Sequence, residues 1–201
     1  MSVTDLGWDA APHALGLLQL REDPQYARIP AERHIALVEA ALEDGRSLAD
    51  RIHDRWGRNP GSIAARCKVP VIHSEDDAGY GSTIVYADYA TRARSITLYI
   101  PAILRLDRLI ALRSAQVPLG IGRTMPMFLA HELYHHFDAL RGSARLSRQH
   151  AVRIFSVGPW HWTSGLSSLS EIAAGAFAQQ LLGLSFHPKF LDLLIPKSEG
   201  R

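Results

Sequence analysis

The 201-residue chain fits one domain, and its 47 % hydrophobic residues can bury a core, which excludes a globally disordered protein. The net charge is only +2 and the arginines are spread along the chain, so nucleic-acid binding is not indicated. No apolar run approaches the ~18 residues of a membrane span. The acidic start of the chain does not match a secretory signal, so we expect a cytoplasmic protein without a membrane partner.

Residues 1–30 carry three prolines and short apolar patches, which predicts an N-terminal arm packed on a domain formed by residues 31–201. Helical spacing of apolar residues begins at Ala31 and continues to Trp56, where glycines and a proline interrupt it. A short helix follows over 62–67. The single cysteine, Cys67, excludes an internal disulfide, and we expect it to be a small buried hydrophobe rather than a reactive thiol.

Three strands are predicted next. Residues 69–72 form an expected edge strand, because Pro70 lacks a ladder donor. Residues 82–89 and 95–100 are rich in β-branched and aromatic side chains, and their short connection predicts a hairpin. Helical spacing returns over 102–112. A few antiparallel strands followed by helices predict an α+β fold.

The stretch Met127–Phe137 contains His-Glu-x-x-His, formed by His131, Glu132 and His135. On a helix, His131 and His135 lie one turn apart on the same face, so two imidazoles can converge on one metal ion. Glu132 is rotated by about 100° and can take a proton from a metal-bound water. The alternative is two ordinary helical histidines with an exposed glutamate between them. Thr124 is the expected N-cap of this helix, and Gly142 stands where its C-terminal cap would be.

A catalytic zinc normally has three protein ligands and an open position for water, so two histidines are not enough. Glu171 precedes the apolar stripe of a predicted helix by one turn, on the same side, and a metal ion would compensate for its burial. The segment Ser168–Glu171 also fits a capping box, in which Glu171 would only bond the backbone. The local sequence leaves both readings open.

Residues 156–170 are predicted to be a long loop that contains His161 between two tryptophans. His161 is either an ordinary loop residue or a group that overhangs the metal and holds a developing oxyanion, and Tyr134 and His136 are two further candidates for that role. The arginines between 141 and 153 form either a solvated surface or a clamp for acidic substrate segments.

The motif from His131 to His135, followed by Glu171-x-x-Ala174-x-x-Phe177-Ala178-x-x-Leu181-Leu182, resembles the ImmA/IrrE-type metallopeptidases, a branch of the gluzincins. Residues 63–71 and 82–100 are similar to the short helix, strand and hairpin that precede the motif helix in that family. Coverage is roughly residues 60–185. The resemblance implies a zincin-like domain with Zn²⁺ bound by His131, His135 and Glu171.

The same resemblance implies that Glu132 is the general base in hydrolysis of peptide bonds. The substrate would be a protein or peptide, in this family associated with repressor proteins and with stress or mobile-element regulation. We expect the strand over 95–100 to hold an extended peptide beside the metal.

Two other functions are considered. Tyr134 replaces the family's usual glycine, and the Trp160 loop lengthens the interval before Glu171. Both features motivate a catalytically silent zinc module that regulates or binds other proteins, in which Tyr134 or His161 closes the fourth position. Peptide deformylase also carries His-Glu-x-x-His, but Cys67 lacks the Gly-Cys-Leu context of its cysteine ligand.

Overall fold

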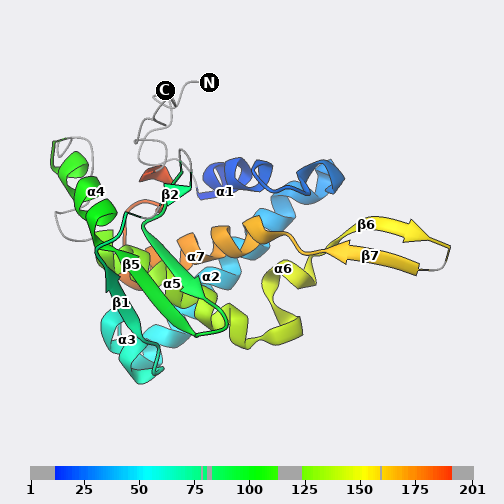
Figure 1. Ribbon diagram of the computed structural model, residues 1–201. Coiled ribbons are helices and arrows are strands. Elements are labelled where there is room, and N and C mark those ends of the chain that lie inside the picture. The colour runs from blue at the N-terminus through cyan, green and yellow to red at the C-terminus, as the bar shows by residue number, and fades with distance from the viewer. Residues whose placement is uncertain (1–11, 78, 81–82, 113–123, 159, 192–201) are drawn as a thin grey trace.

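The computed structural model describes residues 12–77, 79–80, 83–112, 124–158 and 160–191 (Figure 1). Over these residues the protein has a mixed α+β architecture, as predicted. The helices are α1 (Pro12–Arg21), α2 (His34–Trp56), α3 (Pro60–Arg66), α4 (Ile100–Leu112), α5 (Thr124–Leu140), α6 (Leu146–Gln149) and α7 (Ser167–Leu182). The strands are β1 (Val71–Ser74), β2 (Gly79–Tyr80), β3 (Thr83–Ile84), β4 (Ala87–Ala90), β5 (Ser95–Tyr99), β6 (Val152–Val157) and β7 (Trp160–Ser164), and the 3-10 turns are η2 (Tyr26–Arg28), η3 (Ala31–Arg33) and η4 (Gly142–Ala144).

Three long helices, α2, α5 and α7, pack together and bury most of the core (Figure 1). The apolar stripe of α2 faces α7, whereas Ile35, near the start of the helix, is 62 % exposed. α2 and α7 approach closely at Gly45, where an added Cβ would lie 2.2 Å from the carbonyl oxygen of Ala173. A side chain at this position would push the two helices apart.

The sheet that lies against α5 has the strand order β1-β5-β4 (Figure 1). β4 and β5 form the predicted antiparallel hairpin, and β1 is an edge strand as predicted. β1 pairs with β5 in parallel, so the sheet is mixed rather than antiparallel. The strand predicted over 82–89 is divided, because β3 pairs with β2 and only the segment from Ala87 pairs with β5. Ser82 lies outside the described residues.

The predicted N-terminal arm contributes to the core. In α1, Leu15 and Leu20 are buried, and the helix packs on α2 and α7. Asp23 then accepts hydrogen bonds from the backbone N–H and the hydroxyl of Ser168, at the first turn of α7. Residues 1–11 lie outside the described part of the chain. The segment 12–29 is therefore integrated with the domain through packing and through a buried carboxylate.

The prediction of a long loop over residues 156–170 is wrong. The segment forms an antiparallel hairpin, β6–β7, and α7 already begins at Ser167 (Figure 1). The hairpin projects away from the helices. The run from Val152 to Trp162 is rich in β-branched and aromatic residues, which favour a strand.

Two smaller expectations concern single features of the chain. Cys67 is half-buried and packs against the core, and burial raises the pKa of its thiol, so it is a poor nucleophile. Gly142 follows α5 with a left-handed φ of 60°, as expected for a residue that ends a helix.

In the described residues, no helix has both the length and the apolar character to cross a membrane.

Candidate metal centre

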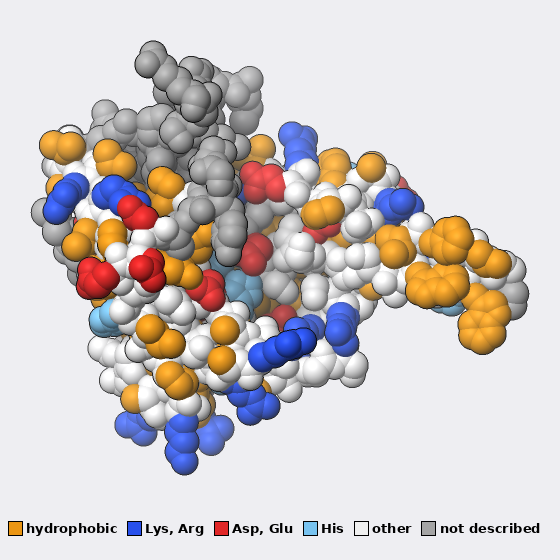
Figure 2. All heavy atoms as spheres, viewed as in Figure 1, with side chains coloured by type: hydrophobic (Ala, Val, Ile, Leu, Met, Phe, Trp, Pro, Cys, Tyr) orange, Lys and Arg blue, Asp and Glu red, His pale blue; other side chains and the backbone are white. Residues whose placement is uncertain are grey.

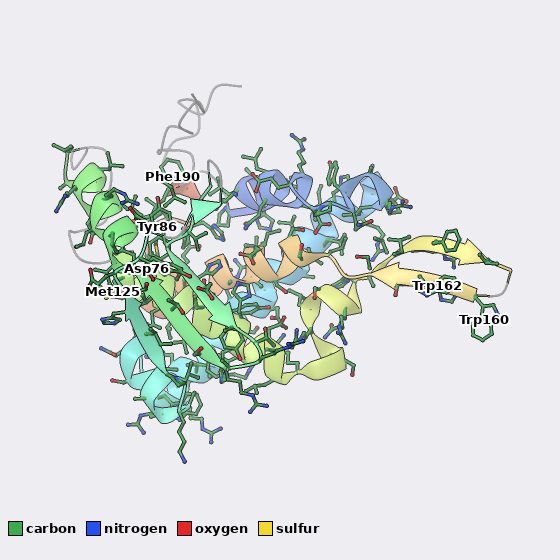
Figure 3. All side chains as sticks on the ribbon, viewed as in Figure 1. Asp76, Tyr86, Met125, Trp160, Trp162 and Phe190 are labelled. Atoms are coloured by element: carbon green, nitrogen blue, oxygen red, sulfur yellow. The ribbon has the colours of Figure 1, made fainter. Side chains whose placement is uncertain are left out.

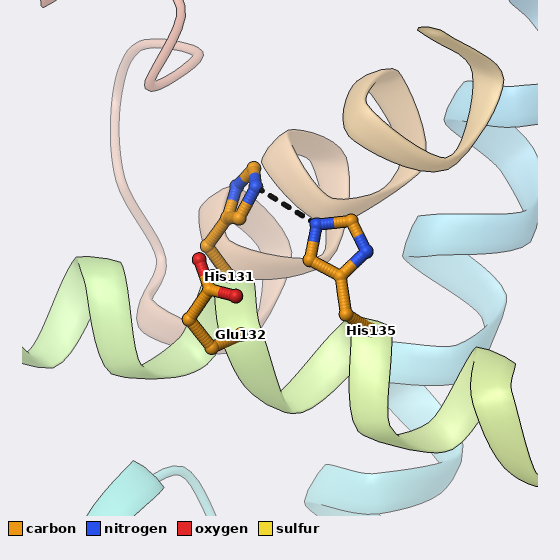
Figure 4. A group of neighbouring side chains, drawn as sticks. All are labelled: His131, Glu132 and His135. Atoms are coloured by element: carbon orange, nitrogen blue, oxygen red, sulfur yellow. Dashed lines mark hydrogen bonds between the residues drawn. The ribbon is translucent and has the colours of Figure 1, made fainter. Parts of the chain in front are cut away.

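Two imidazole rings from α5 point toward one another (Figure 4). The Nε2 atoms of His131 and His135 are 3.2 Å apart, one helical turn along the same face. α5 begins at Thr124, whose hydroxyl donates to Asp107 of α4 rather than capping the helix, so the N-cap prediction is wrong. The expected pairing of two histidines on one helical face is present.

Glu171 reaches the same point from α7. Its Oε2 lies 3.1 Å from Nε2 of His131, and its Oε1 lies 3.3 Å from Nε2 of His135. The capping-box alternative is wrong, because α7 begins at Ser167 and Glu171 therefore lies beyond its first turn. In a capping box, Glu171 would accept a hydrogen bond from the backbone N–H of Ser168. In the structure, Asp23 accepts that hydrogen bond instead.

The spacing of these three groups can be tested against a zinc ion. Tetrahedral bonds of about 2.0–2.1 Å place neighbouring ligand atoms about 3.3 Å apart. The two ring nitrogens are 3.2 Å apart, and each has one oxygen of Glu171 nearby, Oε2 at 3.1 Å from His131 and Oε1 at 3.3 Å from His135, so these separations are close to that value. Two imidazoles and one carboxylate are also a donor set that catalytic zinc uses, with one position left for water. His131, His135 and Glu171 therefore fit a zinc ion in both chemistry and spacing.

Glu132 is buried beside this cluster, and one of its oxygens lies within 4.8 Å of a nitrogen of each imidazole. These three residues could themselves hold a metal ion, although Glu171 lies closer to both ring nitrogens. Burial raises the pKa of Glu132, and the neighbouring His131 and His135 only partly offset this effect. A carboxylate with a raised pKa accepts a proton more readily, as a general base must.

The pKa of Glu171 shifts in the other direction. Burial alone would raise the pKa, but hydrogen bonds and charge interactions with His131 and His135 outweigh burial and hold it well below its usual range. The two carboxyl groups of the cluster therefore differ: Glu171 stays ionised, as a metal ligand must, whereas Glu132 is poised to exchange a proton.

Two cavities meet at the cluster, and His131, Glu132 and Glu171 line both. The first, of about 250 Å³, has polar and apolar walls in nearly equal parts; we call it the apolar cavity after the part formed by Tyr86 and Phe128, whose rings stack with centroids 4.7 Å apart. The second, of about 440 Å³, is lined by polar groups from β4, α5 and the start of α7. In Figure 2 the surface is hollowed where a histidine side chain shows between acidic ones. The arrangement provides an apolar and a polar compartment on either side of the candidate metal position.

β4 borders these cavities, and among the described residues it is an edge strand of the sheet. Ala87 lines both cavities, and Asp88 and Tyr89 line the polar one. The prediction that the strand over 95–100 holds an extended peptide is wrong, because β5 lies between β1 and β4 and its ladder groups are already paired. The strand that could accept an added peptide strand beside the cluster is β4.

The three residues predicted to stabilise an oxyanion are not brought to the cluster. The hydroxyl of Tyr134 donates to Asp44 of α2 at 2.7 Å, and burial together with Asp44 raises the pKa of Tyr134 far above its usual value. Nδ1 of His136 lies 3.1 Å from the hydroxyl of Tyr89. His161 lies on β7, in the projecting hairpin, and lines neither cavity.

The predicted arginine clamp is divided among several roles. Nη1 of Arg141 donates to Oδ1 of Asp44 at 2.8 Å, and this is the same carboxylate that accepts the hydrogen bond from the Tyr134 hydroxyl. Arg145 lines the polar cavity, whereas Arg148 and Arg153 are exposed. Arg145 is therefore the member of this stretch placed to meet a substrate.

His187 is a further candidate that the sequence pattern does not predict: it is 2 % exposed and lines the apolar cavity. Its ring occupies the space above Gly175, where an added Cβ would lie 2.4 Å from Cε1. Nδ1 accepts from the N–H of Lys189 at 3.3 Å, and Nε2 makes no hydrogen bond of good geometry within the described residues. Burial lowers the pKa of His187 to about 4, with a partial offset from the carbonyl of Ile172. A glycine inside a strongly apolar helix was the available signal, because such a glycine often marks close packing.

Comparison with known proteins identifies no relative of this chain. No family model, no curated protein and no solved structure matches it.

Proposed function

We propose that the protein is a zinc-dependent metallopeptidase of the ImmA/IrrE type. The observation that carries the proposal is the cluster of His131, His135 and Glu171: the two ring nitrogens are 3.2 Å apart and each lies 3.1–3.3 Å from one carboxylate oxygen, which is close to the ligand spacing of a tetrahedral zinc ion. Glu132 beside the cluster, with its raised pKa, supplies the base that a hydrolase needs and a purely structural zinc site does not.

A zinc ion held by His131, His135 and Glu171 would supply a Lewis acid for the scissile carbonyl and a bound water of lowered pKa. Glu132 would accept the proton that this water loses and would pass it to the leaving amine. The substrate lies extended along β4, where main-chain hydrogen bonds to the strand edge fix its register. The two cavities then receive side chains on either side of the bond that is cut.

His187 is the residue of the apolar cavity that is suited to donate a hydrogen bond to the developing oxyanion. With a pKa of about 4 it is neutral at physiological pH, and the acceptor role of Nδ1 leaves the proton on Nε2. The ring lies over Gly175, beside the carbonyl of Ile172, so this role would require the Nε2 proton to turn from α7 toward the oxygen that becomes negative in the transition state.

The rival proposal, a silent zinc module, depended on Tyr134 or His161 closing the metal site. The Tyr134 hydroxyl is bonded to Asp44, and His161 lies on the projecting hairpin. These placements favour an open position and so favour the enzyme. A repressor or another regulatory protein in the cytoplasm remains the substrate class that the family resemblance implies.

The proposal is tested by metal analysis together with hydrolysis of a random peptide library read by mass spectrometry. Glu132→Gln should retain zinc and lose hydrolysis. Glu171→Ala should lose most of its zinc as well, and Glu39→Ala, an exposed glutamate on α2, is the matched control that should change neither. Equal zinc content in Glu171→Ala, or peptide cleavage by Glu132→Gln, would contradict the proposal.

A further inference from the structure

The hairpin β6–β7 has one apolar and one polar face. Phe155 pairs with Trp162 and Val157 with Trp160, and directly paired residues share a face of a sheet. Side chains alternate between faces along a strand, so these four share one face. Figure 3 labels the two tryptophans, Trp160 and Trp162, on β7. The opposite face carries two polar pairs, Ser156 with His161 and Arg153 with Thr163.

The described residues leave this apolar face uncovered. Phe155, Val157, Trp160 and Trp162 are 57, 55, 72 and 53 % exposed, and hydrophobic side chains gather at the far end of the hairpin in Figure 2. The rings of Phe155 and Trp162 contact each other, with centroids 5.6 Å apart, but this leaves most of their surface in water. A two-stranded sheet is marginally stable in water by itself, and a contiguous exposed apolar patch generally marks an interaction site.

The stretch of sequence that forms and flanks the hairpin carries charges of one sign. Residues 139–170 contain four arginines and no aspartate or glutamate. Arg148 and Arg153, at the base of the hairpin, are exposed. The surroundings of the apolar face therefore complement a partner that is both apolar and negatively charged.

Two occupants fit this combination poorly. A second copy of the chain would bring like charges together, and the four side chains offer roughly 500 Å² per copy from typical side-chain areas. A stable interface needs ~800 Å² per partner. Single-stranded nucleic acid needs cations beside its stacking platform, but Arg153 and His161 lie on the face opposite the aromatic rings.

We propose that the hairpin β6–β7 docks the protein on an anionic lipid surface. Trp160 and Trp162 enter the boundary between headgroups and acyl chains, the position that tryptophan favours in membranes. The polar face, which includes Arg153, stays toward water, and the exposed Arg148 beside the base of the hairpin meets lipid phosphates. The hairpin projects from the body, so its tip reaches a flat surface without collision of the helices (Figure 1). This docking does not depend on the metal centre.

The experiment is co-sedimentation of the full chain with vesicles of phosphatidylcholine alone and of phosphatidylcholine mixed equally with phosphatidylglycerol. Binding should favour the anionic vesicles and weaken with added salt. The double variant Trp160→Ser with Trp162→Ser should bind about tenfold more weakly. The matched control is Leu104→Ser with Leu109→Ser, two exposed residues of α4 at the other end of the molecule, and it should bind as the natural chain does.

Three results would overturn the proposal. The first is no binding to either vesicle, and the second is equal loss of binding in the α4 control. The third is self-association or binding to single-stranded oligonucleotides, in place of vesicle binding, that disappears in the tryptophan variant. Arg148→Glu should abolish the preference for anionic vesicles. Glu171→Ala should bind vesicles normally, so a failure of docking and a failure of the proposed peptidase function are distinguishable.

Discussion

The substitution Tyr134→Phe separates a structural from a catalytic role for the tyrosine inside the metal-binding motif. The ring is fully buried, and its hydroxyl donates to Oδ2 of Asp44 at 2.7 Å. Phenylalanine keeps the ring and removes only this bond. Because the hydroxyl points to α2, we expect the variant to lose stability and to retain zinc and hydrolysis.

The magnitude follows from the surroundings of Asp44. A buried hydrogen bond to a charged acceptor contributes about 1.5–3 kcal/mol. Arg141 still contacts both oxygens of Asp44, at 2.8 and 2.9 Å, so the carboxylate is not left unpaired and the cost lies at the lower end, about 2 kcal/mol. For a chain of this length, each kcal/mol lowers Tm by about 2–4 °C, so Tm should fall by about 4–8 °C.

Thermal unfolding, zinc analysis and peptide cleavage would be measured on the same preparations. Tyr99→Phe is the matched control, because Tyr99 also donates to a carboxylate, Asp88 at 2.8 Å, from a half-buried site. Its Tm should fall less. If Tyr134→Phe were as stable as the natural chain but lost hydrolysis, the structural assignment would be refuted, and Tyr134 would return to the list of catalytic candidates.

The parts predicted well from sequence are those that depend on neighbours along the chain. The spacing of His131 and His135 implies a shared face once a helix is assumed, and the β4–β5 hairpin follows from two β-rich runs joined by a short connection. Both need only local geometry. The hairpin β6–β7 also has a local signal in its strand-forming residues, but the glycines and serines between 156 and 170 favour a loop in the sequence pattern.

The parts that could not be predicted depend on contacts between distant segments. Glu171 was ambiguous because the cap of α7 comes from Asp23, which is 145 positions away from Ser168. His187 approaches the cavity only because α7 has a glycine at 175 over which the chain returns. Tyr134 lies beside a ligand in sequence, yet its ring faces another helix. Tertiary packing decided each of these, and periodicity does not encode it.

Three further outcomes test these long-range contacts. Asp23→Ala should lower the free energy of unfolding by about 2–3 kcal/mol, because the N–H and hydroxyl of Ser168 lose a buried carboxylate at a helix N-terminus. Zinc affinity should fall as well, since α7 carries the third ligand. An unchanged urea unfolding curve would refute this prediction. Gly175→Ala should lower the free energy of unfolding by about 1–3 kcal/mol, because the added methyl group clashes with the His187 ring. Gly61→Ala, at an exposed position of α3, should change it by no more than about 1 kcal/mol. Equal unfolding midpoints for the two variants would show that the ring moves freely. The pKa of His187 falls from 6.5 to about 4 on folding, so between these pH values the unfolded chain binds a proton that the folded chain does not. Stability of the metal-free protein should therefore be full above about pH 6.5 and fall by up to about 3 kcal/mol toward pH 4. His187→Phe should flatten that dependence in urea titrations across the same range, and an unchanged slope would mean that the buried ring is not the group that titrates.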